Sequence, residues 1–251
     1  MKRTVVIAAM EREVQPLVRT WQRTALSSGD QNWIAFEKED QAVVISGIGK
    51  KNAERVAQVA VARYQPATLI SAGLAGALIR SLKAGSLVTP NVVVDAADGR
   101  EYRCAATDVD IVGGGILVTA NEITGAEGKG KLAEQFHGLI VDMEAAGVAK
   151  VAQEKQISFR CVKAISDEAD FVMSPMARFV NETGNFQSGR FAAWAAVRPW
   201  QWTRVVTLGR NSSKAARALC EWLEKNLFRD MRAAEVVTLE RAELPDAIAR
   251  R

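Results

Sequence analysis

The chain has 251 residues, of which 48% are hydrophobic and 25% are charged, values that are ordinary for a soluble globular protein. Its formal net charge of +4 comes from 33 basic and 29 acidic residues that are not gathered into a stripe, which argues against a nucleic-acid-binding protein. Three cysteines without a CxxC spacing argue against a disulfide framework and a zinc site. No segment reaches the roughly 18 apolar residues of a membrane span, so we expect a cytoplasmic protein.

The first half of the chain alternates short apolar runs, which predict buried strands, with segments of helical spacing. The first run is too short for a signal peptide, and charged residues follow it at once. Strands are expected at residues 4–9, 33–37, 42–46, 67–72 and 87–94. Helices are expected at residues 11–20 and after Gly47-Ile48-Gly49-Lys50.

The second half predicts strands at residues 115–119, 138–141 and 159–165, and helices at 128–136, between the last two strands, and at 200–227. Strands that alternate with helices are typical of an α/β protein. We therefore expect one three-layer domain over residues 1–228, with a central mixed, mostly parallel sheet flanked by helices. Residues 229–251 are expected to be a peripheral tail.

Three carboxylates lie close to the ends of predicted strands. Glu144 and Asp167 each end an apolar run, with an Ala-rich helix between them. This order predicts two parallel strands whose carboxyl ends bear the acids, the usual place of ligands in α/β sheets. Glu13 comes shortly after the first strand. Taken alone, each acid could simply stabilise a helix start, but three at one sheet edge indicate a site.

Two glycine segments and one histidine carry weaker signals. Gly47-Ile48-Gly49-Lys50 matches neither a Walker loop nor a GxGxxG fingerprint, so it is either a tight turn or a ligand-facing loop. Gly73-Leu74-Ala75-Gly76 follows a buried strand and would allow a ligand or another segment close approach. His137 is the only histidine and lies in a polar turn, which excludes a Ser-His-Asp site.

Residues 4–170 resemble the nucleoside phosphorylase/nucleosidase superfamily, and specifically its methylthioadenosine/adenosylhomocysteine nucleosidase branch. The two glycine segments contribute to the resemblance, together with residues 8–14, but Asp142-Met143-Glu144-Ala145 and Ala164-Ile165-Ser166-Asp167 are its most specific parts. It implies a nucleoside phosphorylase-like fold, a homodimer, and cleavage of a purine N-ribosidic bond without a metal or an organic cofactor.

The resemblance also implies roles for individual residues. Asp167 is expected to act as the acid at the N7 atom of adenine, and Glu13 to activate the attacking water. Glu144 is expected to accept the ribose hydroxyls, with Met143 packed on the sugar. The remaining expected substrate-binding residues are Ser166, Ile48, Leu74, Ala75, Gly76, Glu122 and Ile123.

Three departures from the family pattern concern the pocket wall. Leu74 stands where these nucleosidases usually have Ser, and Asp142 where they usually have Glu. Glu122 stands where an aromatic residue usually stacks on the base. The substitutions at Leu74 and Glu122 leave open a non-catalytic nucleoside-binding protein.

Beyond residue 170, the run from Phe191 to Asn211 resembles the hopanoid-associated phosphorylase branch of the same superfamily. This segment is either a core helix or a wall for a large apolar 5′ substituent. A phosphorylase is the main alternative to hydrolysis. However, Leu74 offers no phosphate ligand and Glu13 would repel phosphate, which favours water unless Arg178 or Arg190 folds back into the site.

Overall fold

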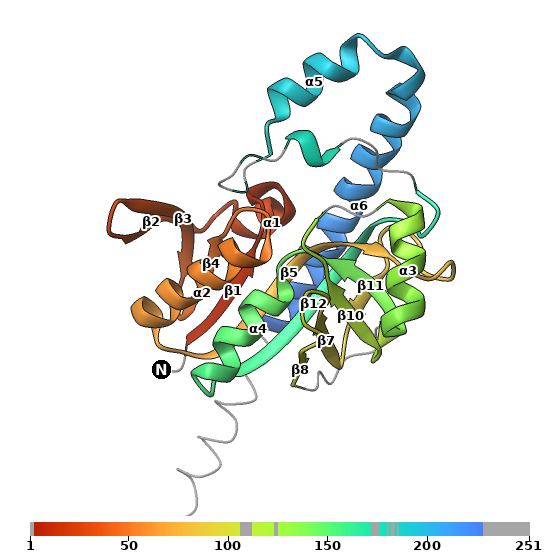
Figure 1. Ribbon diagram of the computed structural model, residues 1–251. Helices are drawn as coiled ribbons and strands as arrows, with labels where there is room; N and C mark the ends of the chain where they lie inside the picture. Colours follow the sequence, from red (N-terminus) through yellow and green to blue (C-terminus); the bar gives the residue numbers. More distant parts are fainter. Residues whose placement is uncertain are drawn as a thin grey trace, which may run out of the picture.

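The computed structural model describes residues 3–105, 112–122, 125–171, 176–179, 181, 184 and 186–227 (Figure 1). They form one mixed sheet of 12 strands with helices on both faces, so the expected three-layer α/β architecture is confirmed. Ile123 and residues 229–251 lie outside the described residues. Among the described residues, no helix combines the length and the apolarity needed to cross a bilayer.

The sheet follows the order β2-β3-β4-β1-β5-β11-β10-β7-β8, and β12 joins it through β5. Its larger strands are β1 (Arg3–Ala8), β2 (Gln22–Ser28), β3 (Gln31–Lys38), β4 (Gln41–Ile45), β5 (Pro66–Ala77), β10 (Ile116–Thr119), β11 (Gly138–Asp142) and β12 (Ser158–Asp167). Its short strands are β6 (Leu87–Thr89), β7 (Val92–Asp95), β8 (Glu101–Arg103) and β9 (Val112–Gly113).

The helices are α1 (Glu11–Val18), α2 (Lys50–Tyr64), α3 (Ala126–Phe136), α4 (Ala145–Glu154), α5 (Ser188–Ala196) and α6 (Trp202–Leu227), with short 3₁₀ turns η1 (Met176–Phe179) and η2 (Pro199–Gln201). Successive strand residues point to opposite faces, which divides the core in two. Val5 and Ile7 pack with α2 and α4, whereas Val6 and Ala8 pack with α1 and α6. Leu132 on α3 packs with Val118 and Val141.

Strand β5 brings the two acid-bearing strands together. It pairs in parallel with β12 along most of that strand's length, and its last residues pair with β11 in an antiparallel manner. Asp167 and Val141 therefore both lie in register with Gly76. The expectation that the strands before Glu144 and Asp167 run parallel to each other is wrong, because β11 runs against β5 while β12 runs with it.

Three local expectations are also corrected. The segment Gly73-Leu74-Ala75-Gly76 does not follow the strand but belongs to it, because β5 continues to Ala77. The single strand expected at residues 87–94 is two strands, β6 and β7, divided at Pro90, which lacks the N–H that a strand ladder needs. Strand β2 was not expected, because only Leu26 among its residues is buried and its sequence lacks an apolar pattern.

Candidate active site

The three predicted acids converge on one pocket. Glu13 comes from α1 just after β1, Glu144 is the N-cap of α4 just after β11, and Asp167 is the last residue of β12. All three are buried, and all three line the same cavity. The structure therefore brings together side chains that are far apart in sequence.

Two glycines of β5 make room for two of these acids. A Cβ atom on Gly73 would lie 2.9 Å from Oε2 of Glu13, and one on Gly76 would lie 2.9 Å from Oδ2 of Asp167. Real Cβ atoms do not approach other atoms so closely. The glycines are therefore explained by the close approach of carboxylates to a strand, not by a turn.

Glu144 is held by backbone N–H groups at one end of the pocket. Its Oε1 accepts a hydrogen bond from the Gly49 N–H at 2.8 Å, and its Oε2 accepts one from the Met143 N–H at 3.3 Å. Burial, together with the nearby charge of Asp142, raises the pKa of Glu144 to about 8, although Lys163 and the Gly49 N–H partly oppose the rise. This carboxyl group is oriented and poorly solvated.

Glu13 is the least satisfied acid in the pocket. It is only 3% exposed, and among the described residues its Oε2 has no hydrogen-bond partner. Burial raises the pKa of Glu13 to about 7, against the lowering effect of Lys163 and Arg12. A carboxyl group of this kind can accept a proton near neutral pH.

Lys163 is a buried cation close to Glu13 and Glu144, and it was not predicted from the sequence. Its Nζ forms an ion pair of 2.8 Å with Asp142 and donates to Ser71 Oγ at 3.1 Å. Burial alone would lower the pKa of Lys163, but the carboxylate of Asp142 and other acidic neighbours raise it above its usual value. A lysine inside the apolar run of β12 was the signal that could have indicated it, because unpaired lysines are almost never fully buried.

Asp142 links this cation to the start of α4. Its Oδ1 accepts from Thr119 Oγ1 at 2.7 Å, and its Oδ2 accepts from the Ala145 N–H at 2.9 Å. A carboxylate there favours a helix N-terminus. Asp142 therefore fixes both Lys163 and the helix that presents Glu144, which gives a structural reason for an acid at this position.

Asp167 occupies the other end of the pocket, where a second buried lysine meets it. Lys129 of α3 forms an ion pair with Asp167 Oδ2 and donates to the Glu168 carbonyl oxygen at 2.8 Å. Ser166 Oγ donates to Asp167 Oδ1 at 2.6 Å. Lys129 was not foreseen from the sequence, because its helix gives no hint that this face turns toward a strand end.

Comparison with known proteins defines the family. The family model described as the phosphorylase superfamily matches residues 3–112 and 103–188. The chain belongs to the phosphorylase superfamily. The superfamily resemblance expected from the sequence motifs is thus confirmed.

Relatives of known name within this superfamily are similar at low identity. A 5′-methylthioadenosine/S-adenosylhomocysteine nucleosidase of Bacillus thuringiensis (strain Al Hakam) is 29% identical over 204 residues, covering 66% of this chain and 86% of that protein. The nucleosidase of the same name from Staphylococcus epidermidis is 27% identical over 196 residues, again covering 66% of this chain and 86% of that protein.

Two solved structures share the fold of this chain. The Helicobacter pylori 5′-methylthioadenosine/S-adenosylhomocysteine nucleosidase matches with a TM-score of 0.69 and 16% identity, covering 91% of this chain and 98% of that one. The futalosine hydrolase of Helicobacter pylori strain 26695 matches with a TM-score of 0.66 and 18% identity, covering 89% of this chain and 96% of that one.

The pocket that Glu13, Glu144 and Asp167 line also contains most of the other residues predicted to bind the substrate. Met143, Ser166 and Glu122 line it, as do Ile48 and the segment from Leu74 to Gly76. Arg12, Phe186, Leu208 and Ser212 were not predicted to line it but do. Leu208 belongs to α6, so the C-terminal helix contributes to the pocket wall as well as to the core.

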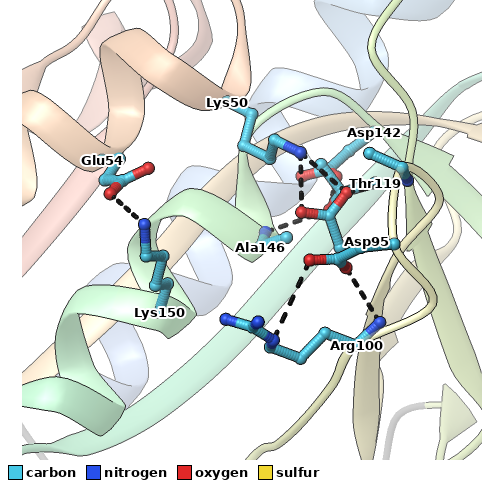
Figure 2. A network of polar contacts seen from close by, with 10 residues as sticks. Lys50, Glu54, Asp95, Arg100, Thr119, Asp142, Ala146 and Lys150 are labelled. Carbon is cyan, nitrogen blue, oxygen red and sulfur yellow. Dashed lines mark hydrogen bonds and ion pairs between the residues drawn. The ribbon is translucent and has the colours of Figure 1, made fainter.

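The loop Gly47-Ile48-Gly49-Lys50 supports the site without offering a phosphate cradle. Gly49 has a φ of 108°, which favours glycine, and its N–H binds Glu144. Lys50 forms an ion pair with Asp95 at 2.6 Å (Figure 2). Lys50 is thus paired with a carboxylate at the end of β7. The loop is more than a tight turn, because the N–H of Gly49 also orients Glu144.

The described residues contain no cluster of three or more metal-binding His, Cys, Asp or Glu side chains. The three cysteines are free. Burial raises the pKa of Cys104 to about 12 and that of Cys220 to about 11, and it raises the pKa of Cys161 well above its usual value. None of these thiols has the low pKa of a nucleophile. His137 is exposed at the C-terminus of α3, as expected.

Proposed function

We propose that this protein is a purine nucleosidase that cleaves the N-ribosidic bond of an adenosine derivative, of the methylthioadenosine/adenosylhomocysteine type, by attack of water. One observation carries the proposal: Glu13, Glu144 and Asp167 line a single pocket from three separate elements of the chain. The names of the relatives at 27% and 29% identity support the substrate class.

The sugar end of the pocket, defined by Glu13 and Glu144, suits the charge that develops during cleavage. Departure of the base leaves positive charge on the ribose, which nearby carboxylates stabilise strongly in a water-poor site. Glu144 accepts hydrogen bonds from the ribose hydroxyls, and Met143 packs against the sugar. The two N–H groups on Glu144 hold it in one orientation for this purpose.

Glu13 activates the water. A general base is most effective when its pKa lies near the working pH, and the pKa of Glu13 is raised to about 7. Its Oε2 has no partner among the described residues and can accept the proton of a water held above the sugar. Asp167 engages the purine at the opposite end, which we call the base end.

Water is favoured over phosphate as the nucleophile. Ser71 Oγ is bonded to Lys163, and Arg178 and Arg190 are exposed residues that do not line the pocket. One observation favours the alternative of a phosphorylase of the hopanoid-associated type, because Arg12 lines the pocket beside Glu13. The negative charge of Glu13 opposes phosphate at the same place.

An assay of base release distinguishes these possibilities. Purified protein is incubated with methylthioadenosine, adenosylhomocysteine and deoxyadenosine, with and without phosphate, and adenine and sugar products are measured. We expect adenine and free sugar at a rate independent of phosphate. Phosphate-dependent formation of a sugar 1-phosphate would establish the phosphorylase, and binding without release of base would establish a non-catalytic protein.

A further inference from the structure

Lys129 is a buried cation inside the pocket whose position the family motifs do not explain. It is 2% exposed and lines the cavity next to Asp167. A Cβ atom on Gly76 would lie 3.2 Å from its Nζ, so the absence of a side chain at Gly76 gives the ammonium group its space. The lysine is therefore fitted to this site and does not merely reach it from the surface.

The hydrogen bonds of the pair leave one N–H donor of Lys129 and acceptor sites of Asp167 for a ligand. A lysine ammonium has three N–H donors, and among the described residues two of them go to Asp167 and to the Glu168 carbonyl. Among the described residues, the carboxylate of Asp167 accepts from Lys129 and from Ser166 Oγ, and a carboxylate has room for further hydrogen bonds of this kind. The pair therefore presents an ammonium donor and a carboxylate acceptor side by side to a ligand.

We propose that Lys129 is the group that donates to N7 of the purine, and that Asp167 accepts from the amino group at C6. This inference rests on the proposed function and differs from the family resemblance in one role, because the resemblance implies that Asp167 is the acid at N7. The adjoining edge of adenine offers an acceptor at N7 and a donor at N6, which matches the pair. A 6-oxopurine offers two acceptors there, and its oxygen would face the carboxylate.

The reaction then balances without another participant. The electron pair of the C1′–N9 bond moves to the purine as the bond breaks, and the proton of the Lys129 ammonium moves to N7. Water adds to C1′ and gives its proton to Glu13. Release of neutral adenine and sugar is followed by return of a proton from Glu13, through solvent, to the Lys129 amine.

Binding of adenine and 7-deazaadenine tests this assignment independently of turnover, because the second base lacks only the N7 acceptor. Calorimetry is performed on the wild type, Lys129→Met, Asp167→Ala and the control Lys131→Met, an exposed lysine on the same helix. We expect the wild type to bind adenine more tightly by about 10- to 100-fold, the range for one hydrogen bond from a charged donor.

This preference should survive in Asp167→Ala and Lys131→Met and disappear in Lys129→Met. A preference that survives Lys129→Met, vanishes in Asp167→Ala, or is absent from the wild type overturns the role of Lys129. Failure of the proposed function is recognised separately, because the wild type would then release no base from any nucleoside. Melting curves of each variant establish that it is folded.

A second, independent observation concerns the surface of the α5–α6 hairpin, which comprises α5, η2 and the first turns of α6. The hairpin extends away from the sheet (Figure 1). Its tip exposes four large apolar side chains: Val197 at 68%, Trp200 at 70%, Trp202 at 53% and Val206 at 49%. These are the exposed large hydrophobic residues among the described part of the chain.

The charge around this apolar tip has a single sign. Residues 183–220 include no Asp or Glu, and their basic residues are Arg190, Arg198, Arg204, Arg210, Lys214 and Arg217. Tryptophan combined with Arg and Lys on a helical surface is typical of segments that lie in the headgroup region of a membrane. A symmetric contact between two copies would instead bring these like charges together.

We infer that the α5–α6 hairpin docks on an anionic lipid bilayer, with the two tryptophans in the headgroup region and the arginines on the lipid charges. Each basic residue near an anionic membrane strengthens binding through its charge. Because Leu208 and Ser212 of α6 line the pocket, such docking would set the outer wall of the active site close to the lipid surface.

Co-sedimentation with lipid vesicles tests the docking. One set of vesicles contains phosphatidylcholine alone, and the other also contains about 30% phosphatidylserine, an anionic lipid. We expect salt-sensitive binding to the anionic vesicles only, at least tenfold weaker in Trp200→Ser/Trp202→Ser and in Arg204→Ser/Arg210→Ser. The charge-matched control Lys51→Ser/Lys155→Ser, exposed residues outside the hairpin, should bind as the wild type does.

Two outcomes would overturn this inference. One is the absence of binding to anionic vesicles at low salt. The other is a homodimer, measured by sedimentation, that dissociates when Trp200 and Trp202 are replaced, because the hairpin would then be an interface between two copies. A homodimer that persists in this variant agrees with both the docking surface and the homodimer predicted from the family resemblance.

Discussion

The carboxyl groups at the two ends of the pocket have different surroundings. At the sugar end, burial raises the pKa of Glu13 to about 7 and that of Glu144 to about 8, and the nearby lysine is bound to Asp142. At the base end, the lysine is bound directly to Asp167. The two ends therefore differ in the partner of the nearby lysine, which is Asp142 at the sugar end and the predicted acid Asp167 itself at the base end.

The largest effect is expected when the proton acceptor at the sugar end is removed. Glu13→Gln keeps the shape of the side chain but cannot accept a proton, and a general base typically contributes about 10²- to 10⁴-fold. We expect kcat to fall by this amount while adenine binding at the base end is unchanged. Steady-state kinetics and calorimetry measure the two quantities, and a variant with wild-type kcat would exclude Glu13 as the base.

Breaking the ion pair beneath the sugar end should affect folding. Lys163→Met leaves Asp142 charged, buried and without its cation, a change that typically costs about 3–5 kcal/mol. We expect a loss of this size in the free energy of unfolding, measured with urea. The exposed Lys155→Met is the control. A double variant, Lys163→Met/Asp142→Asn, should recover part of the stability, because the amide carries no charge and keeps an oxygen acceptor for the donors of Thr119 and Ala145; if it does not, the penalty is not that of an unpaired charge.

Adding one methyl group beside Glu13 should disturb the sugar end alone. In Gly73→Ala the new Cβ would lie 2.9 Å from Oε2 of Glu13, and overpacking of this kind costs roughly 1–3 kcal/mol. We expect lower kcat and lower stability. Gly130→Ala is the matched control on α3, because nothing lies within 4 Å of its Cβ position and alanine favours a helix by about 0.5–1 kcal/mol.

The pH dependence of turnover should report the sugar end. Glu13 must be ionised to accept a proton, and its pKa is raised to about 7, so its titration alone should raise kcat/KM about tenfold per pH unit below pH 7. Glu144 is required as a carboxylate and its pKa is raised to about 8, so it should add a second rise of about tenfold per pH unit that continues to about pH 8. The rise attributed to Glu13 should be absent in Glu13→Gln. A flat profile between pH 5.5 and 8 would contradict these ionisations.

The sequence was sufficient to predict the layers of the fold and three carboxylates that line one pocket. Continuous apolar runs predicted β1, β5, β11 and β12. Glu13, Glu144 and Asp167 lie at or just after the ends of three of these runs, which is how the sequence indicated them. The family motifs then assigned roles to Glu13, Glu144 and Asp167. These features are local, so they are visible in a window of a few residues.

The cations could not be predicted in the same way, because their partners are set by packing. Lys129 meets Asp167 because α3 packs on β11. Lys163 of β12 meets Asp142 of β11 because both strands pair with β5. The antiparallel pairing of β11 with β5 has no local signal either. The sequence predicted close approach of some group at Gly73 and Gly76, but nothing nearby in sequence shows that two acids approach them.

The most direct test of the two-ended pocket is a crystal structure with a non-hydrolysable adenosine analogue bound. Our account predicts the ribose hydroxyls on Glu144, a water or its mimic on Glu13, and the N6 and N7 atoms of the base on Asp167 and Lys129. A nucleoside bound in the reverse direction, or at a site that lacks these four side chains, would contradict it.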